Sequence, residues 1–307
     1  MDAALNVTYI TLGGYVEVQK YRYLYFVIMF GVYILIICCN STIVCLIVIH
    51  QNLHQPMYIF IAALLLNSVL FSTAIYPKLL IDFLSEKQII SYSACLFQVF
   101  MFYFLTCSEF LLLAAMAYDR YVSICKPLQY PTIMTKTTVS LLLVLAWILP
   151  ASHIAVPVVL NIKNKLCSFT LKGIYCNNSL YHLYCVNSLA LSIYGVVVLL
   201  NVALFPMVFI LFTYTKILII SYRSCREVRK KAAQTCLPHL LVLMNYSFLL
   251  TYDVTIIRVE SDIPTVRFVM TLQMVIFNHI FNPLMYGLKM KEISKHLKRL
   301  FSQIKVN

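Results

Sequence analysis

Ionisable side chains inside long apolar stretches are the residues of this sequence whose types and spacing could do chemistry. Glu109 and the pair of consecutive residues Asp119 and Arg120 lie in one apolar stretch, at about residues 93–122. Eleven positions separate Glu109 from Arg120, so on a helix both side chains project from a similar face, about three turns apart. A charge inside a membrane is costly and therefore suggests a function. An ion pair that only packs is the alternative.

Catalytic and metal chemistry find little support in the sequence. An intramembrane hydrolase needs a nucleophile with a base, or His and Glu at zinc spacing, and the seven His are scattered. His50 and His54 have helical i, i+4 spacing but lack a third ligand. A retinal-type light receptor needs a Schiff-base lysine, and residues 268–288 contain none. We therefore expect neither an enzyme nor a resident cofactor or metal.

The composition identifies the elements that must position these residues. Of the 307 residues, 62% are hydrophobic and 11% are charged, against about 45–50% and about 25% in soluble domains. Seven apolar stretches are long enough to cross a membrane as helices, at about 23–49, 57–84, 93–122, 138–160, 190–219, 236–257 and 265–287. The expected fold is an all-α membrane protein, a single seven-transmembrane helix bundle over residues 1–307. From Lys289 to Lys305 apolar residues recur every three or four positions, which predicts a short amphipathic helix on the inner leaflet.

The distribution of basic residues predicts the orientation of the bundle. Fifteen of the 24 Lys and Arg fall after the third stretch, between the fifth and sixth, and in the tail. Because positive charge marks the cytoplasmic side, we expect residues 1–22 outside and the tail 288–307 inside, in the plasma membrane. The net charge of +13 then reflects contact with lipid headgroups rather than nucleic acid. Asn6 begins a glycosylation sequon on the outer side, and Asn177 begins another.

Four of the eleven cysteines fall on the predicted outer side, where disulfides persist. Cys95, Cys167, Cys176 and Cys185 allow three pairings. We favour Cys95 with Cys176, which ties the third stretch to the long loop at about 161–189, and Cys167 with Cys185 inside that loop. Metal binding is the alternative, but no His pairs with these thiols at zinc-like spacing.

Motifs spread along the chain resemble those of one family. Met116-Ala-Tyr-Asp-Arg-Tyr-Val-Ser-Ile-Cys125 resembles the MAYDRYVAIC signature of olfactory receptors, within the rhodopsin-like class of G-protein-coupled receptors. Further matches, in order along the chain, are Pro56-Met-Tyr58, Pro77-Lys78, Trp147, Pro206, Tyr214, Lys231–His239 and Asn282–Tyr286. The match runs through all seven stretches. Among members of the family, the sequence is most similar to the fish-type ones.

The resemblance implies where a G protein would couple. Arg120, held by Asp119 at rest, would be released when the sixth span swings outward and opens an inner cavity. His239 resembles a family residue that contacts the third span, and it titrates near neutral pH; simple packing is the alternative. The coupling residues implied are Asp119, Arg120, Tyr121, Tyr214, His239, Asn282, Pro283 and Tyr286.

Two positions depart from the family pattern. Ser68 stands where many relatives carry a sodium-binding Asp, so Glu109 would face an incomplete ion pocket. A weak sodium site built from Glu109, Ser68 and water is the remaining possibility. Tyr246-Ser247 replaces the Trp that many rhodopsin-like receptors carry in the sixth span.

The resemblance also implies a ligand pocket in the outer half of the bundle. The inward candidates are Gln98, Phe102, Tyr103 and Thr106 of the third span, Val198, Asn201 and Val202 of the fifth, and Leu250, Tyr252, Asp253, Ile256 and Arg258 of the sixth. Arg258 could hold a ligand carboxylate; a solvated Arg, or one paired with Glu260, is the alternative.

The implied function is that of an odorant receptor that activates a heterotrimeric G protein, expected to be the stimulatory type that raises cyclic AMP. If the receptor is olfactory, its membrane would be the cilium of a sensory neuron. A non-olfactory chemosensory role is the alternative. A transporter or channel is a more remote one, because inverted halves or polar paths over several spans do not appear in the sequence.

Overall fold

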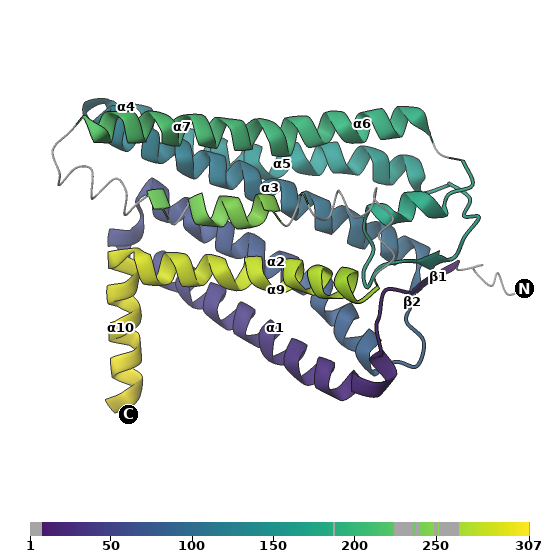
Figure 1. The fold of residues 1–307 in the computed structure, drawn as a ribbon. Coiled ribbons are helices and arrows are strands. Elements are labelled where there is room, and N and C mark those ends of the chain that lie inside the picture. The colour runs from purple at the N-terminus through teal and green to yellow at the C-terminus, as the bar shows by residue number, and fades with distance from the viewer. Residues whose placement is uncertain are drawn as a thin grey trace, which may run out of the picture.

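Long helices that run side by side form most of the molecule (Figure 1). This computed structural model describes residues 8–186, 188–223, 236–237, 240–248, 251 and 264–306. Six helices in this described part are long and apolar enough to cross a membrane, and the fifth of them is continuous through three segments. They are α1 (Val18–Ile49), α2 (Pro56–Leu84), α3 (Tyr92–Cys125), α5 (Lys136–Asn161), the run of α6 (Leu189–Leu199), a π-helical turn (Leu200–Leu204) and α7 (Phe205–Tyr222), and α9 (Pro264–Lys289).

The remaining helices are short or lie at one end of the bundle. The described residues of the sixth predicted stretch, 236–237 and 240–248, are helical as well. α10 (Lys291–Val306) turns across the end of the bundle, and α4 (Tyr130–Ile133) joins α3 to α5 (Figure 1). Short 3₁₀ helices occur at Gln51–Leu53, Pro127–Gln129 and Asn178–Leu183. The expected all-helical membrane fold with a short terminal helix is therefore confirmed.

The helices begin where the sequence supplies caps. Ser91, Thr135 and Ser188 precede α3, α5 and α6, and each side-chain oxygen accepts a hydrogen bond from the backbone N–H three residues on. This satisfies donors that the first helical turn leaves unpaired. α1 begins at Val18, earlier than its apolar stretch, and is distorted at Tyr21. Hydropathy detects the lipid-facing part of a helix, and the helix itself extends beyond that part.

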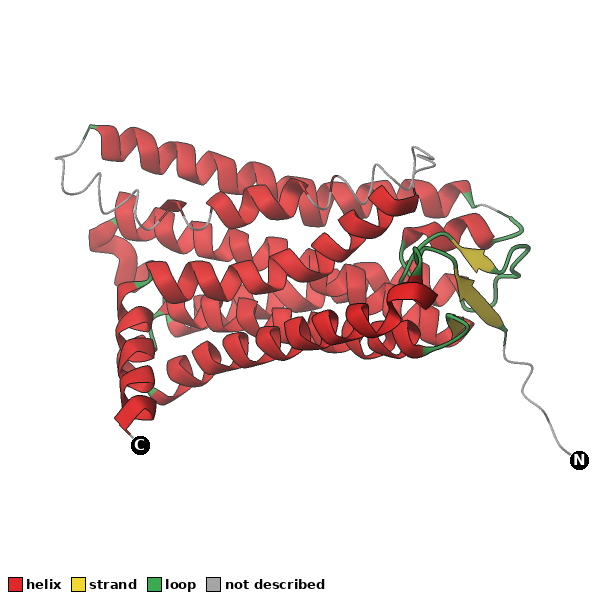
Figure 2. Ribbon diagram, turned by 60° about the horizontal axis from the view of Figure 1, so that its bottom comes forward, coloured by secondary structure: helices red, strands yellow, loops and turns green. Residues whose placement is uncertain are grey.

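A small sheet, which the sequence analysis did not foresee, closes the end of the bundle opposite α10 (Figure 2). β1 (Tyr9–Leu12) lies between β2 (Ile89–Ser91), to which it is antiparallel, and β3 (Thr170–Leu171), to which it is parallel. A Cβ on Gly14 would lie 2.5 Å from the carbonyl carbon of Gly173, so only glycine fits this crossing. The segment that precedes α1 is thereby fixed to the connection between α2 and α3 and to the loop between α5 and α6.

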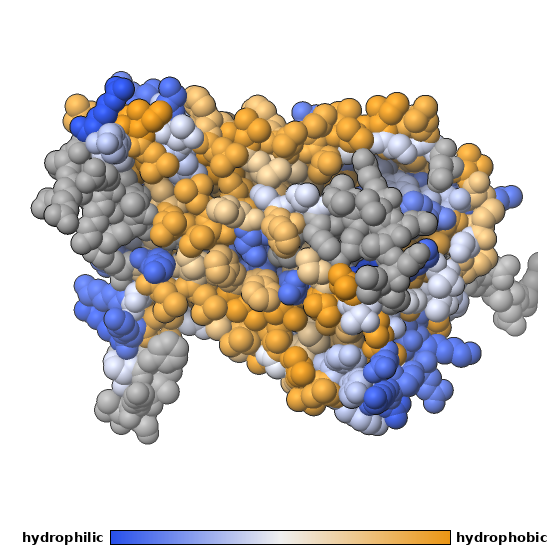
Figure 3. Space-filling view, in the orientation of Figure 1, coloured by the Kyte–Doolittle hydropathy of each residue, from blue (hydrophilic) through white to orange (hydrophobic). Residues whose placement is uncertain are grey.

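The surface of the bundle suits lipid. Hydrophobic side chains cover most of its middle, and hydrophilic ones gather toward the two ends (Figure 3). Many large apolar side chains of α1, α5, α6 and α7 are exposed. In water such a surface would drive aggregation, whereas in a bilayer it faces acyl chains.

Candidate functional site

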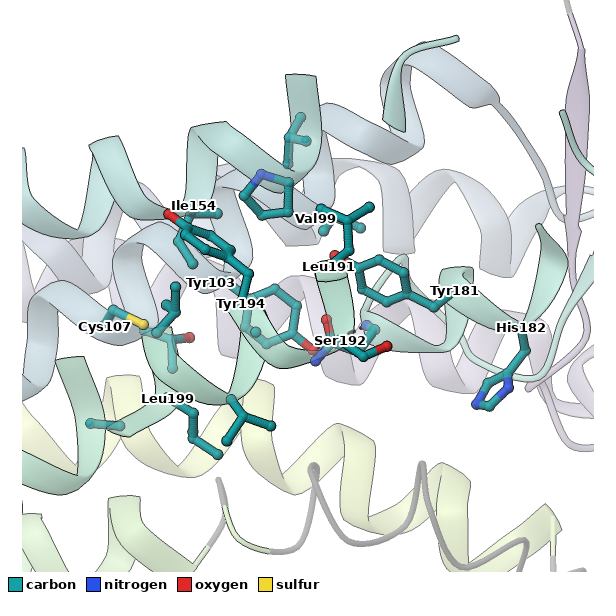
Figure 4. A pocket seen from close by; sticks show the side chains of 18 residues that line it. Val99, Tyr103, Cys107, Ile154, Tyr181, His182, Leu191, Ser192, Tyr194 and Leu199 are labelled. Atoms are coloured by element: carbon teal, nitrogen blue, oxygen red, sulfur yellow. Dashed lines mark hydrogen bonds between the residues drawn. The ribbon is translucent and has the colours of Figure 1, made fainter. Parts of the chain in front are cut away.

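A cavity of about 320 Å³ lies between α3, α5 and α6, beneath the loop that follows β3 (Figure 4). Its volume falls within the range usual for small-molecule pockets. Tyr103 and Cys107 of α3, Tyr181 of the loop, and Leu191 and Tyr194 of α6 surround it (Figure 4). The described residues that line it include no Asp, Glu, Lys or Arg. The cavity therefore suits a mainly apolar ligand.

Three side chains of α3 hold the loop over the cavity. The Cys95–Cys176 disulfide joins the loop to the N-terminal end of α3. Gln98 Oε1 accepts a hydrogen bond from the backbone N–H of Cys176 at 2.9 Å. The Tyr103 hydroxyl oxygen accepts one from the backbone N–H of Asn178 at 3.0 Å. Because Asn178 also lines the cavity, these bonds fix its roof.

Three of the predicted ligand residues, Tyr103, Thr106 and Val198, line this cavity. Gln98 lies outside it and serves the loop, as described. Phe102 is fully buried elsewhere, with its ring centroid 5.4 Å from that of Phe71 and 5.0 Å from that of Tyr175. Neither Gln98 nor Phe102 lines this cavity.

Of the ligand residues predicted in the fifth span, Val198 lines this cavity, whereas Asn201 and Val202 do not. Asn201 is exposed and Val202 is fully buried against neighbouring side chains, so neither lines the cavity. Both lie in the π-helical turn at Leu200–Leu204. A π turn holds an extra residue and rotates the helix face, which a regular 3.6-residue spacing does not anticipate. The remaining predicted ligand residues lie outside the described part of the chain: Leu250, Tyr252, Asp253, Ile256 and Arg258.

Several cavity residues were missed by the sequence analysis. Ile154, Pro157 and Val158 come from α5, and Tyr181 and His182 come from the loop. Tyr194 on α6 donates a hydrogen bond from its hydroxyl to the backbone carbonyl of His153 at 3.2 Å, which joins α6 to α5. The apolar residues of α5 carried no distinguishing signal, because apolar side chains on that helix also face lipid.

At the other end of α3, Asp119 holds two partners. Its Oδ2 accepts hydrogen bonds from Nε of Arg120, at 2.9 Å, and from an Nη of the same guanidinium. Its Oδ1 accepts one from the Tyr130 hydroxyl at 2.8 Å. Asp119 is fully buried, so these bonds compensate for the cost of burying a charge. Tyr130, on α4, was not foreseen. Burial, and next the Asp119 carboxylate, raise the pKa of Tyr130, which keeps its phenol a donor.

Of the other predicted coupling residues, Tyr214 lies near Tyr286 and Arg120, whereas Asn282 lies beside Glu109. Tyr214 and Tyr286 are buried, and within the described residues the Tyr214 hydroxyl has no hydrogen-bond partner. Tyr121 is half-buried, and Pro283 lies inside α9. His239 is outside the described residues.

Glu109 lies midway along α3 in a buried polar cluster. Its Oε1 accepts a hydrogen bond at 2.8 Å from Nδ2 of Asn282, which also lies 3.4 Å from Ser68 Oγ. The opposite amide oxygen of Asn282 has no partner among the described residues. Carboxylate, hydroxyl and amide oxygens suit a hard cation. No group of three or more His, Cys, Asp or Glu that could hold a metal ion occurs in the described ranges.

The loop above the cavity contains the second disulfide, Cys167–Cys185, so the structure has both pairings that the sequence analysis favours. Asn177, the second sequon, is 9% exposed, and its Oδ1 accepts a hydrogen bond from the backbone N–H of Ser179. A buried, bonded side chain is a poor glycosylation acceptor. Asn6 lies outside the described residues.

A helix bundle with a roofed apolar cavity at one end and a buried Asp–Arg pair at the other has the architecture of a seven-transmembrane receptor. The family model described as "Olfactory receptor" matches residues 29–304. The chain therefore belongs to the olfactory receptor family, within the rhodopsin-like class of G-protein-coupled receptors, whose members are multi-pass membrane receptors and not enzymes.

Individual relatives match over nearly the whole chain. Human olfactory receptor 2AT4 is 32% identical over 88% of this chain and 85% of its own length. Human olfactory receptor 11A1 is 32% identical over 96% of this chain and 94% of its own. Olfactory receptor-like protein COR2 of Gallus gallus is 32% identical, over 94% and 93%.

Proposed function

We propose that this protein is an odorant receptor that binds a small molecule in the cavity between α3, α5 and α6 and activates a heterotrimeric G protein at the opposite end. The supporting observation is the arrangement along α3. Thr106 lines the cavity, and Asp119, with its partners Arg120 and Tyr130, lies thirteen residues further on, about 20 Å along the helix. One rigid element therefore joins the two sites.

The ligand is proposed to be a neutral, mainly apolar molecule. A carboxylate or ammonium would lose its hydration in the cavity, and the described lining offers no opposite charge to compensate. Arg258 would change this if it reached the cavity, because a guanidinium binds carboxylates in a bidentate manner. In that case Arg258→Ala should abolish responses to acids and spare neutral odorants; an equal loss of both would contradict a role for Arg258 in binding.

At the inner end, the Asp119–Arg120–Tyr130 bonds hold the resting state. Activation releases Arg120 as the sixth span moves outward and admits the G protein. Tyr214 and Tyr286 then support the open state, Pro283 lets α9 bend because it lacks an N–H, and His239 acts as a latch on the third span. A sodium ion held by Glu109, Ser68 and the free amide oxygen of Asn282 would stabilise the resting packing of α2, α3 and α9.

The proposed orientation places the sheet and both disulfides outside the cell and α10 inside. Disulfides persist in the oxidising exterior, and Lys295, Lys298 and Arg299 on α10 fit the inner leaflet. The residues preceding β1 would then carry the glycan on Asn6. The location proposed is the plasma membrane, in sensory cilia if the role is olfactory. The residues of the second and sixth spans are similar to those of fish-type olfactory receptors, which supports a fish-type member.

A cyclic AMP reporter assay tests the function. Cells that express the chain are screened with water-soluble and volatile odorants, beside Arg120→Ala at matched surface expression. We expect neutral odorants to raise cyclic AMP through the stimulatory G protein, and the variant to lose the response. A response that persists unchanged in Arg120→Ala would contradict the coupling role.

A further inference from the structure

Two histidines meet where α10 packs against α1. His50 ends α1, and His296 lies in the second turn of α10. Their ring centroids are 3.9 Å apart, and His296 is only 8% exposed. Neither residue belongs to the cavity or to the Asp119 site.

The apolar face of α10 makes the rest of this contact. Ile293 is fully buried. Gly287 of α9 lies between the two helices: a Cβ on it would lie 3.3 Å from both Ile43 of α1 and Leu297 of α10. The absence of a side chain at Gly287 therefore leaves room for α1 and α10 to pack close to α9. The membrane surface can also cover the apolar face of an amphipathic helix. Lipid can therefore take the place of α1 against α10 if the contact between the two helices opens.

The docked geometry requires a neutral imidazole at His296. Nδ1 of His50 lies 3.0 Å from the carbonyl oxygen of Leu46; a carbonyl only accepts, so Nδ1 carries the proton. Nε2 of His296 lies 3.2 Å from Nδ2 of Asn52. An amide nitrogen only donates, so Nε2 of His296 must be the bare acceptor. A proton added there would face the amide hydrogens.

The charges around His296 also oppose its protonation. On α10 the basic residues Lys295 and Arg299 and the acidic residue Glu292 lie near His296. Across the contact lies His50. His54 follows it in the chain, and its Nε2 lies 3.0 Å from the carbonyl oxygen of Val48. Burial, and next the nearby His50 and Arg299, lower the pKa of His296.

We propose that the His50–His296 pair is a pH-sensitive latch that holds α10 against α1 at neutral cytosolic pH and releases it on acidification. Docked α10 binds fewer protons than undocked α10, in which His296 has its ordinary pKa of about 6.5. Docking is therefore strongest above that value and weakens as the pH falls below it. Each unit of difference between the two pKa values weakens docking about tenfold at low pH. The latch does not rest on the proposed ligand or G protein.

Distance measurements on the full chain in lipid nanodiscs test the latch. Nitroxide amino acids introduced genetically at Ser302 on α10 and Thr137 on α5, both exposed, avoid labelling the cysteines. Pulsed electron paramagnetic resonance then gives the distribution of distances at pH 7.5 and pH 5.5. We expect one population at pH 7.5 and a second, displaced population at pH 5.5. A distribution that does not change with pH would overturn the proposal.

Three variants assign the effect to the pair. His296→Gln keeps an acceptor for Asn52 but cannot be protonated in this range, so it should stay docked at both pH values. His50→Asn removes the facing imidazole and should reduce the low-pH population. His54→Gln, the matched control, should switch as the unsubstituted chain does. A low-pH population in His296→Gln equal to that of the unsubstituted chain would refute the latch.

Discussion

Tyr130→Phe should raise the activity of the receptor in the absence of ligand. The substitution keeps the ring and removes only the hydroxyl that donates to Oδ1 of Asp119 at 2.8 Å. Asp119 is fully buried and its other oxygen is bonded to Arg120, so the loss weakens the group that restrains Arg120. The activation proposed above releases Arg120 from this cluster, so losing the bond should act on the resting state.

The magnitude follows from the environment of the bond. A hydrogen bond to a charged group contributes about 1.5–3 kcal/mol. Tyr130 is half-buried, and water replaces part of the lost interaction, so we expect about 1 kcal/mol. Since about 1.4 kcal/mol corresponds to a tenfold change in an equilibrium constant, the ratio of active to resting receptor should rise about fivefold.

The assay is cyclic AMP in cells without odorant, divided by the surface expression measured on the same cells. Tyr222→Phe is the matched control, because Tyr222 ends α7 at the same end of the bundle as α4 (Figure 1) but is 77% exposed. The ligand-free signal of this variant should not change. Ligand-free cyclic AMP in Tyr130→Phe equal to that of the unsubstituted receptor, at equal surface expression, would refute the restraining role of Tyr130.

Three further substitutions test the roof, the sheet and the cavity. Gln98→Leu leaves the buried N–H of Cys176 without its acceptor, at a cost of about 1–3 kcal/mol. The variant should have a lower unfolding temperature and a lower odorant potency. Unchanged values for both would contradict the role of this bond in fixing the loop over the cavity. Gly14→Ala places a Cβ against the backbone of Gly173 and should reduce surface expression, whereas Gly31→Ala, where the same atom meets nothing within 4 Å, should not. Val198→Trp fills part of the cavity and should abolish odorant responses while the protein still reaches the surface; a response of normal potency would place the ligand elsewhere.

The helices could be predicted from the sequence because lipid imposes a simple rule. A spanning segment must be apolar over its length and must satisfy its own backbone groups, so hydropathy locates α2, α3 and α5 closely. The sheet could not be predicted in this way. β3 has only two residues, and its pairing with β1 joins segments about 160 positions apart, which no local pattern specifies.

The same contrast applies to the site. Asp119 and Arg120 stand out because charges are rare inside apolar stretches, and the outer cysteines because few pairings are open to them. Tyr130 carried no signal, since a tyrosine in a loop is ordinary until a folded chain places it beside a carboxylate. Asn201 lies in a π turn, which changes the face that a helix presents without any marker in the sequence.

Guanine nucleotide exchange on a purified G protein tests the central claim most directly. The receptor in nanodiscs is mixed with the stimulatory heterotrimer and an odorant that the cell screen identifies, and binding of a non-hydrolysable GTP analogue is followed over time. The account predicts that the odorant accelerates exchange with the unsubstituted receptor and not with Arg120→Ala. Equal exchange rates with and without odorant, or an acceleration that survives Arg120→Ala, would contradict it.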